Sequence, residues 1–399
     1  MRRREETYRY VNLWLKHLDS EGLIELEKEI EMPLYEFVTD ILEETYQKYV
    51  SKVPSVSIEL DNYSDYIIAP KNGSYSLDDF LLNRLLRSIT EFKYINEKYT
   101  TGSSYYYHTE CKVKIDKNRI ENVETDPEQK RKVVAHEILH AMKTQFFDGS
   151  FAGADRYFLM KEELKSIFGS EINDFDAIGT TANEKYKHSG VLIKDPSEAN
   201  EEYGRYDSKL IVLDEALNEK DSLQVSNINK PVGRYDIEEN QTILIRNPSS
   251  SNFSVTNYAY IIERLLDDKT MFEGQYIRPL SFFEEFDRKY TPIFRSQYNS
   301  DSTATKILST QLCQISSNDK TQHPDIEKHI KLLNTLYLCA ERKYVFEDLD
   351  EEWREKTIRI LGKNGIFTVS DNKISSNKKL FFSEEFEKVR EKISGKQPK

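Results

Sequence analysis

The stretch from Val133 to Met142 contains the pattern His-Glu-x-x-His, with histidines at positions 136 and 140 around Glu137. On a helix these two imidazoles share one face and can both reach one zinc ion, while Glu137 can accept a proton from a metal-bound water. All other residues of the stretch are apolar, which predicts a helix buried on most sides. Buried ionisable groups need partners, and a metal ion supplies one. The alternative is a core helix whose histidines make ordinary hydrogen bonds.

The expected helix has recognisable ends and a strand before it. Asp126 suits the N-cap, Pro127 suits the first helical position, and Asp148-Gly149 would close a helix of about twenty residues. Cys111–Asp116 alternates polar and apolar side chains, which predicts a strand. The edge of that strand can pair with an extended peptide.

Composition limits the classes of function. The chain has 399 residues and a net charge of −12, which argues against a nucleic-acid binder. No apolar stretch has the length of a membrane span, and Arg2–Arg4 is followed by polar residues rather than by the apolar core of a signal peptide. Three scattered cysteines favour a reducing compartment. We therefore expect a cytoplasmic protein, with export by a route that needs no signal peptide left open.

Periodicity elsewhere predicts an α+β fold, mostly helical, with a small sheet packed on the motif helix. We expect an N-terminal helical and mixed region at 1–100, a catalytic domain at 101–270 and a helical C-terminal domain at 271–399. Helices are expected at 5–50 with a break at Pro33, and at 76–99, 157–168, 258–266, 280–290, 307–312, 323–344, 351–361 and 383–393. Further strands are expected at 56–60, 66–69 and 365–369.

A second group of ionisable residues follows the apolar run 210–213. Glu215 and Glu219 are four residues apart and share one face of an expected helix. A zinc ion held by two histidines needs a third protein ligand from elsewhere. The metzincin pattern does not supply it, because Lys143 and Phe146 stand where its glycine and third histidine would be. Glu215 follows the apolar run and is expected to be the deeper of the two acids; the alternative is a solvated acidic face.

The two segments together resemble the gluzincins, zinc peptidases that combine HExxH with a glutamate on a later helix. Thermolysin-like members carry that glutamate in an N-E-x-x-x-D pattern, which matches residues 214–219 in part. Asp214 replaces the common asparagine, Ala216 replaces the glycine of other members, and the gap between His140 and Glu215 is long. The resemblance covers about 25 residues and supports the superfamily rather than a narrower family.

This resemblance implies a zinc-dependent metallopeptidase acting on a peptide or protein substrate. Its single zinc ion would be held by His136, His140 and Glu215, with Glu137 as the general base. Glu219 would be a supporting carboxylate. Gluzincins also place a Tyr, His or Arg downstream to stabilise the oxyanion, and the candidates here are Tyr235 and Tyr258, with Arg234 and Tyr260 as further possibilities.

Other readings stay open at this point. One is a non-catalytic binding or regulatory module with a zincin-like fold, which the intact Glu137 disfavours. Another is a toxin or effector protease exported without a signal peptide, which shares the chemistry and differs in substrate. The histidines expected not to bind metal are His17, His108, His188 and His329. If Glu215 is not the third ligand, the next candidates are Asp155, Glu201 and Glu202.

Overall fold

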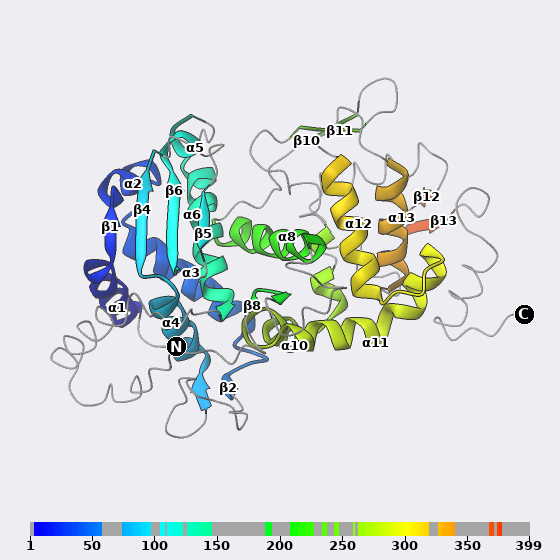
Figure 1. The fold of residues 1–399 in the computed structure, drawn as a ribbon, viewed down its shortest axis with the longest axis horizontal. Helices are drawn as coiled ribbons and strands as arrows, with labels where there is room; N and C mark the ends of the chain where they lie inside the picture. The colour runs from blue at the N-terminus through cyan, green and yellow to red at the C-terminus, as the bar shows by residue number, and fades with distance from the viewer. Residues whose placement is uncertain are drawn as a thin grey trace, which may run out of the picture. The chain divides into compact units, whose positions relative to one another are not determined.

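The computed structural model describes most of the N-terminal third of the chain and parts of the remainder: residues 4–57, 74–96, 104–107, 110–122, 126–145, 188–193, 208–226, 234–237, 243–246, 258–259, 262–318, 326–339, 367–370 and 373–376. These residues are mostly helical with a small β-sheet, an α+β architecture (Figure 1). The chain divides into two compact units. The first comprises Met1–Asp207, Asp221–Ile228 and Asp268–Phe282, and the second comprises the remaining residues.

A four-stranded sheet forms the centre of the first unit. Its order is β1 (Asp19–Glu21), β4 (Glu91–Ile95), β6 (Lys112–Asp116) and β5 (Tyr105–Tyr107). The first three strands are parallel, and β5 pairs antiparallel with β6. Phe92 and Val113 are neighbours in register on one face and are fully buried. The alternation expected for a sheet with one buried face is therefore present.

The opposite face of this sheet carries charged and aromatic side chains. Lys93 and Lys112 lie 3.3 and 3.9 Å from the carboxylate of Glu91. On the same face, the rings of Tyr105 and Tyr107 pack edge to face with centroids 4.2 Å apart. The three consecutive tyrosines thus form a strand, and the hydroxyl of Tyr106 turns the other way and donates to the carbonyl of Ser88 over 2.6 Å.

The helices of the first unit are α1 (Arg4–His17), α2 (Leu23–Glu29), α3 (Leu34–Tyr49), α4 (Leu77–Ser88), α5 (Lys117–Asn122) and α6 (Pro127–Lys143). Helix α6 lies against β5 and β6 and contacts both α3 and α4 (Figure 1). The predicted helices within 5–50 and their interruption at Pro33 are confirmed. Ser76 caps α4, since its hydroxyl accepts from the backbone N–H of Asp79 over 3.4 Å.

Three sequence predictions in this unit are wrong. Helix α4 ends at Ser88 rather than near Tyr99, because Ile89 turns to an extended backbone and the next residues form β4. Helix α6 ends at Lys143 rather than at 148–149, because Thr144 leads into β7 (Thr144–Gln145). Strand β6 does not offer a sheet edge, because β4 and β5 pair with its two sides.

The remaining elements of the first unit are short. β7 pairs with β8 (His188–Ser189), which pairs with β9 (Leu192–Ile193). β2 (Ser55–Ser57) pairs with β3 (Ser74–Ser76), so the strand expected at 56–60 is described only at its start. Helix α10 (Asp268–Phe272) continues into a π-helix, η4 (Glu273–Ile277). Helix α8 (Ser208–Val225) confirms the helix expected around Glu215. Its residues Ser208–Lys220 belong to the second unit, and the residues from Asp221 onward belong to the first.

Three helices contribute most of the described core of the second unit: α11 (Pro279–Tyr298), α12 (Ala304–Asn318) and α13 (Ile326–Cys339). The start of α12 is held by α11, because Asp287 accepts from the backbone N–H of Thr305 over 2.7 Å. The hairpins β10 (Arg234–Ile237) with β11 (Ile243–Arg246), and β12 (Phe367–Ser370) with β13 (Lys373–Ser376), also belong here. The strand predicted at 365–369 overlaps β12.

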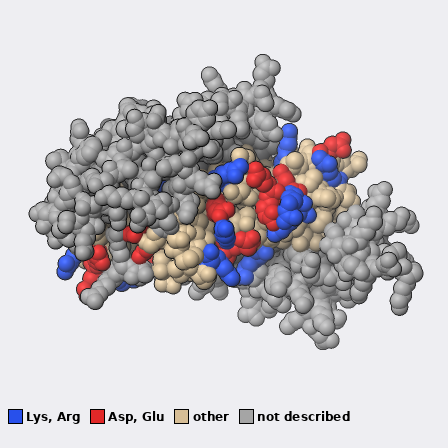
Figure 2. Space-filling model, turned by 90° about the horizontal axis from the view of Figure 1, so that it is seen from below, with Lys and Arg blue, Asp and Glu red and all other residues tan. Residues whose placement is uncertain are grey.

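Charged side chains of both signs are interleaved on the face shown in Figure 2. On α11, Glu285 is 2.7 Å from Arg288 and 2.9 Å from Lys289. Hydrogen bonds from these two cations lower the pKa of Glu285 to about 2. Among the described helices, none combines the length and apolar character needed to cross a membrane.

Several sequence predictions lie outside the described residues. They are the strand at 66–69 and the helices at 157–168, 351–361 and 383–393.

Gly22 is a position at which the fold of the first unit depends on the absence of a side chain. Its φ is 74°, and a Cβ placed there would lie 2.4 Å from the carbonyl oxygen of Tyr94 on β4. We expect Gly22→Ala to lower the free energy of unfolding by about 2–4 kcal/mol, through the left-handed backbone and the clash. Urea unfolding followed by the fluorescence of buried Trp14 measures this loss. Ile24→Ala, at a side chain that is 72% exposed, is the control and should change little; equal stabilities of the two variants would contradict the argument.

Candidate metal centre

Helix α6 supplies the first part of the site. Asp126 stands at its N-cap and Pro127 in its first turn, although the Asp126 side chain makes no capping hydrogen bond. Burial on most sides is confirmed, since Val133–Ala135 and Glu137–Lys143 are all buried. His136 is half-buried and His140 is 9% exposed, so the two imidazoles lie at the less covered side of a largely buried helix.

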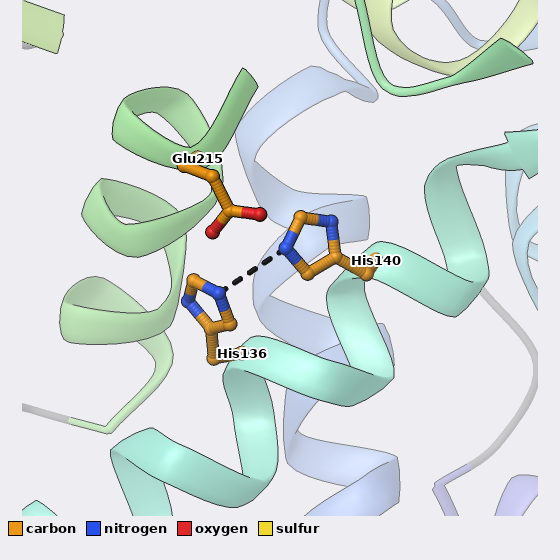
Figure 3. A group of neighbouring side chains, drawn as sticks. All are labelled: His136, His140 and Glu215. Atoms are coloured by element: carbon orange, nitrogen blue, oxygen red, sulfur yellow. Dashed lines mark hydrogen bonds between the residues drawn. The ribbon is translucent and has the colours of Figure 1, made fainter. Parts of the chain in front are cut away.

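The two imidazoles converge on each other (Figure 3). The Nε2 atoms of His136 and His140 are 3.1 Å apart, and the ring planes meet at 80°. Two nitrogens bound to one tetrahedral zinc at the usual bond length stand roughly 3.3 Å apart. The spacing of these two atoms therefore fits a shared metal ion. It also fits a hydrogen bond between the rings, in which one Nε2 donates and the other accepts.

Glu215 comes from α8, and its carboxylate points toward both imidazoles (Figure 3). Its oxygen and the ring nitrogens of His136 and His140 all lie within 4.8 Å of one another. Two imidazoles and one carboxylate form a donor set that zinc accepts, with a fourth position left for water or substrate. The structure thus brings together the three residues expected from the sequence to bind the metal.

Metal binding would fix the protonation of these rings. When both Nε2 lone pairs face an ion, each neutral imidazole must carry its proton on Nδ1. A hydrogen bond between the two Nε2 atoms requires the other tautomer in one ring. An ion at this place therefore replaces the bond between the histidines, and Glu215 adds the negative charge that two neutral rings lack.

The carboxylates next to the site differ in burial. Glu137 is 5% exposed, on the same helix as the two histidines. Glu219 is 4% exposed, whereas Glu215 is only partly buried, so the prediction that Glu215 is the deeper acid is wrong. The first three residues of the apolar run, 210–212, are only half-buried, and Leu213 and Asp214 are buried, whereas continuous burial extends from Ala216 to Leu223. Glu215 thus stands near the more open end of its helix.

The structure describes three of the four residues suggested to stabilise the oxyanion. Tyr235 lies on β10, opposite Ile245 on β11. Tyr258 is fully buried, which favours its packing role. Arg234 begins β10, and Tyr260 lies outside the described residues.

The remaining sequence candidates do not add to the described site. His17 ends α1 and His188 lies on β8, and neither belongs to the group of converging ligands. His108, Asp155, Glu201 and Glu202 lie outside the described residues.

The sequence analysis did not predict a group of charged residues that follows the metal ligands along α6 and α8. Lys143, the last residue of α6, pairs with Asp221 on α8 and lies 5.9 Å from the ring centre of Tyr276. Burial raises the pKa of the Tyr276 phenol far above its usual range, so this ring stays neutral. The available signal was a lysine at the end of an apolar helix, which needs a partner when it is buried.

The two acids of α8 should respond unequally to removal. We expect Glu215→Ala to leave zinc with two protein ligands and to abolish tight binding. Glu219→Ala should retain zinc with affinity reduced roughly 10–100-fold, as is usual for a group that orients a ligand. Competition with a chromophoric chelator measures both affinities, and Gln224→Ala, at an exposed position of α8, is the control. If Glu219→Ala loses the metal and Glu215→Ala keeps it, the two roles are exchanged.

Comparison with known proteins gives no independent assignment of this site. No protein family, no curated protein and no solved structure was found to match the chain.

Proposed function

We propose that this protein is a zinc-dependent metallopeptidase with a zincin-like fold of the gluzincin type. The observation that carries the proposal is the convergence of His136, His140 and Glu215 within 4.8 Å, with Glu137 on the same helix as the histidines. Packing of α6 on a small sheet agrees with such a fold. The likeness concerns the motif helix, the ligand helix and that sheet.

The proposed reaction assigns separate tasks to the four residues. His136, His140 and Glu215 hold the ion, which when bound polarises the scissile carbonyl and lowers the pKa of water. Glu137 accepts a proton from the attacking water and passes it to the leaving amine. Its low exposure strengthens its electrostatic interactions, because little bulk water surrounds the carboxylate. The substrate is a peptide or protein.

Glu137 also separates this proposal from that of a non-catalytic zinc module. A structural zinc site is closed by four protein ligands and has no use for a buried base next to it. Among the described residues the ligand group has three members, which is the number expected at a catalytic site. A protease acting as an exported toxin or effector would have the same metal centre, and only its substrate would distinguish it from another metallopeptidase.

Metal content and hydrolysis test the proposal together. The purified protein should hold about one zinc ion per chain and lose it to chelators, as structural and catalytic zinc proteins do. His136→Ala or His140→Ala should prevent binding. Glu137→Gln should keep the ion and lower hydrolysis of a peptide library by roughly 10²–10⁴-fold, because water activation loses its base. Elemental analysis and mass spectrometry of the digest provide the two readouts.

Two results would remove the proposal. One is a zinc content near zero after purification with zinc present. The other is a Glu137→Gln variant that cleaves the same peptides as fast as the wild-type protein.

A further inference from the structure

A buried group of charges joins α3, α6 and the C-terminal part of α8, and its residues all belong to the first unit. The Nζ atom of Lys143 on α6 lies 2.6 Å from one carboxylate oxygen of Asp221, and that of Lys48 on α3 lies 2.9 Å from the other oxygen. The side chain of Lys143 is 1% exposed, that of Asp221 10% and that of Lys48 17%. Asp221 thus accepts from two ammonium groups, one on each neighbouring helix.

Burial restricts Lys143 and Asp221 to one relative position. A lysine as buried as Lys143 is costly unless its ammonium group is paired and hydrogen-bonded. The ring of Tyr276 lies under the same ammonium at 5.9 Å and adds a favourable cation–π contact. Displacing Asp221 would leave a charge in a site that water does not reach. The position of Asp221 relative to α6 is therefore strongly constrained.

The pair lies close to the metal ligands along both helices. Lys143 follows His140 by three residues, and Asp221 follows Glu215 by six. At the rise of an α-helix these separations are about 4.5 Å and about 9 Å along the axes. Fixing Asp221 against Lys143 consequently fixes how far along α6 the carboxylate of Glu215 stands.

Apolar burial alone does not set the rotation of α8. Every residue from Ala216 to Leu223 is buried, and this run of two turns covers all sides of the helix. An amphipathic helix turns its apolar stripe to the core, but a helix buried all round has no such preference. A directional buried ion pair can specify register in this situation. A rotation by one residue would move both Asp221 and Glu215 away from their partners.

We propose that Asp221, paired with Lys143 and Lys48, is the positioning residue that brings Glu215 to the two histidines. The inference rests on the proposed zinc site and adds the device that assembles it. Asp221 does not contact the ion in this scheme; it acts through the placement of α8. The proposal predicts coupling between Asp221 and Glu215, which are on different turns of one helix.

The test is a double-mutant cycle on zinc affinity. Lys143→Met with Asp221→Leu replaces the pair by apolar side chains, a change that commonly preserves folding. We expect this variant to bind zinc roughly 10–100-fold more weakly. Adding Glu215→Ala to it should cost far less affinity than the same change costs in the wild-type protein, because Glu215 is no longer in place. The absorption spectrum of the cobalt(II) form should change toward that of Glu215→Ala, which loss of stability alone would not cause.

Arg84→Met is the matched control. Arg84 is 9% exposed and belongs to the same unit, but its hydrogen bonds go to the carbonyls of Thr144 and Tyr276. It should reduce the free energy of unfolding of the metal-free protein and leave zinc affinity and the cobalt spectrum nearly unchanged.

The outcomes separate this inference from the proposed function. If the wild-type protein binds zinc through Glu215 and the paired variant keeps both its affinity and the full effect of Glu215→Ala, the positioning role is wrong and the zinc site stands. If the wild-type protein binds no zinc, both are wrong. If the paired variant unfolds, Lys48→Met replaces it in the cycle, because this change removes one of the two ammonium groups that hold Asp221 and leaves Lys143 paired; a smaller coupling of the same sign is then expected.

Discussion

The cost of burying ionisable groups governs the first unit of this protein. Helix α6 carries two imidazoles, a carboxylate and a lysine in a segment that is otherwise apolar and largely buried. Each of these groups is tolerated in such surroundings only when a partner of suitable charge or hydrogen-bonding capacity faces it. His140 faces His136, with an oxygen of Glu215 within 4.8 Å of both rings, and Lys143 pairs with Asp221. Glu215 and Asp221 both belong to α8, so one helix supplies acids to both groups.

Local patterns in the sequence predicted helices α1, α3 and α6 and strand β6, but not the other strands of its sheet. Helices α1, α3 and α6 follow from apolar spacing and from breaks such as Pro33, which act within a few residues. Strand β4 was not predicted, because its charged residues Glu91 and Lys93 resemble the polar face of a continuing helix. Their extended conformation depends on pairing with β1 and β6, which are distant in sequence. Periodicity carries no information about such partners.

The candidate site divides in the same way. The helical spacing of His136 and His140 alone places both rings on one face, so this half of the site could be predicted from a short motif. Glu215 needed a resemblance, because nothing local to α8 says which of its acids faces α6. The relative burial of the two acids was predicted wrongly, because the apolar run begins half-buried and continuous burial begins only after Glu215, at Ala216. Asp221 was missed because its role depends on Lys143, a partner in another helix.

The distance between the ligands along the chain has a further consequence. Between His140 and Glu215 lie 74 residues, so an ion held by both closes a long loop. Cross-links over long loops remove much entropy from the unfolded chain, and the penalty for lengthening a loop grows only slowly with its length. In the proposed site the ion would act as a reversible cross-link. Its stabilisation of the fold would grow with the logarithm of the free metal concentration. Tight capture would also await the docking of α8, so metal uptake would mark a late event in folding.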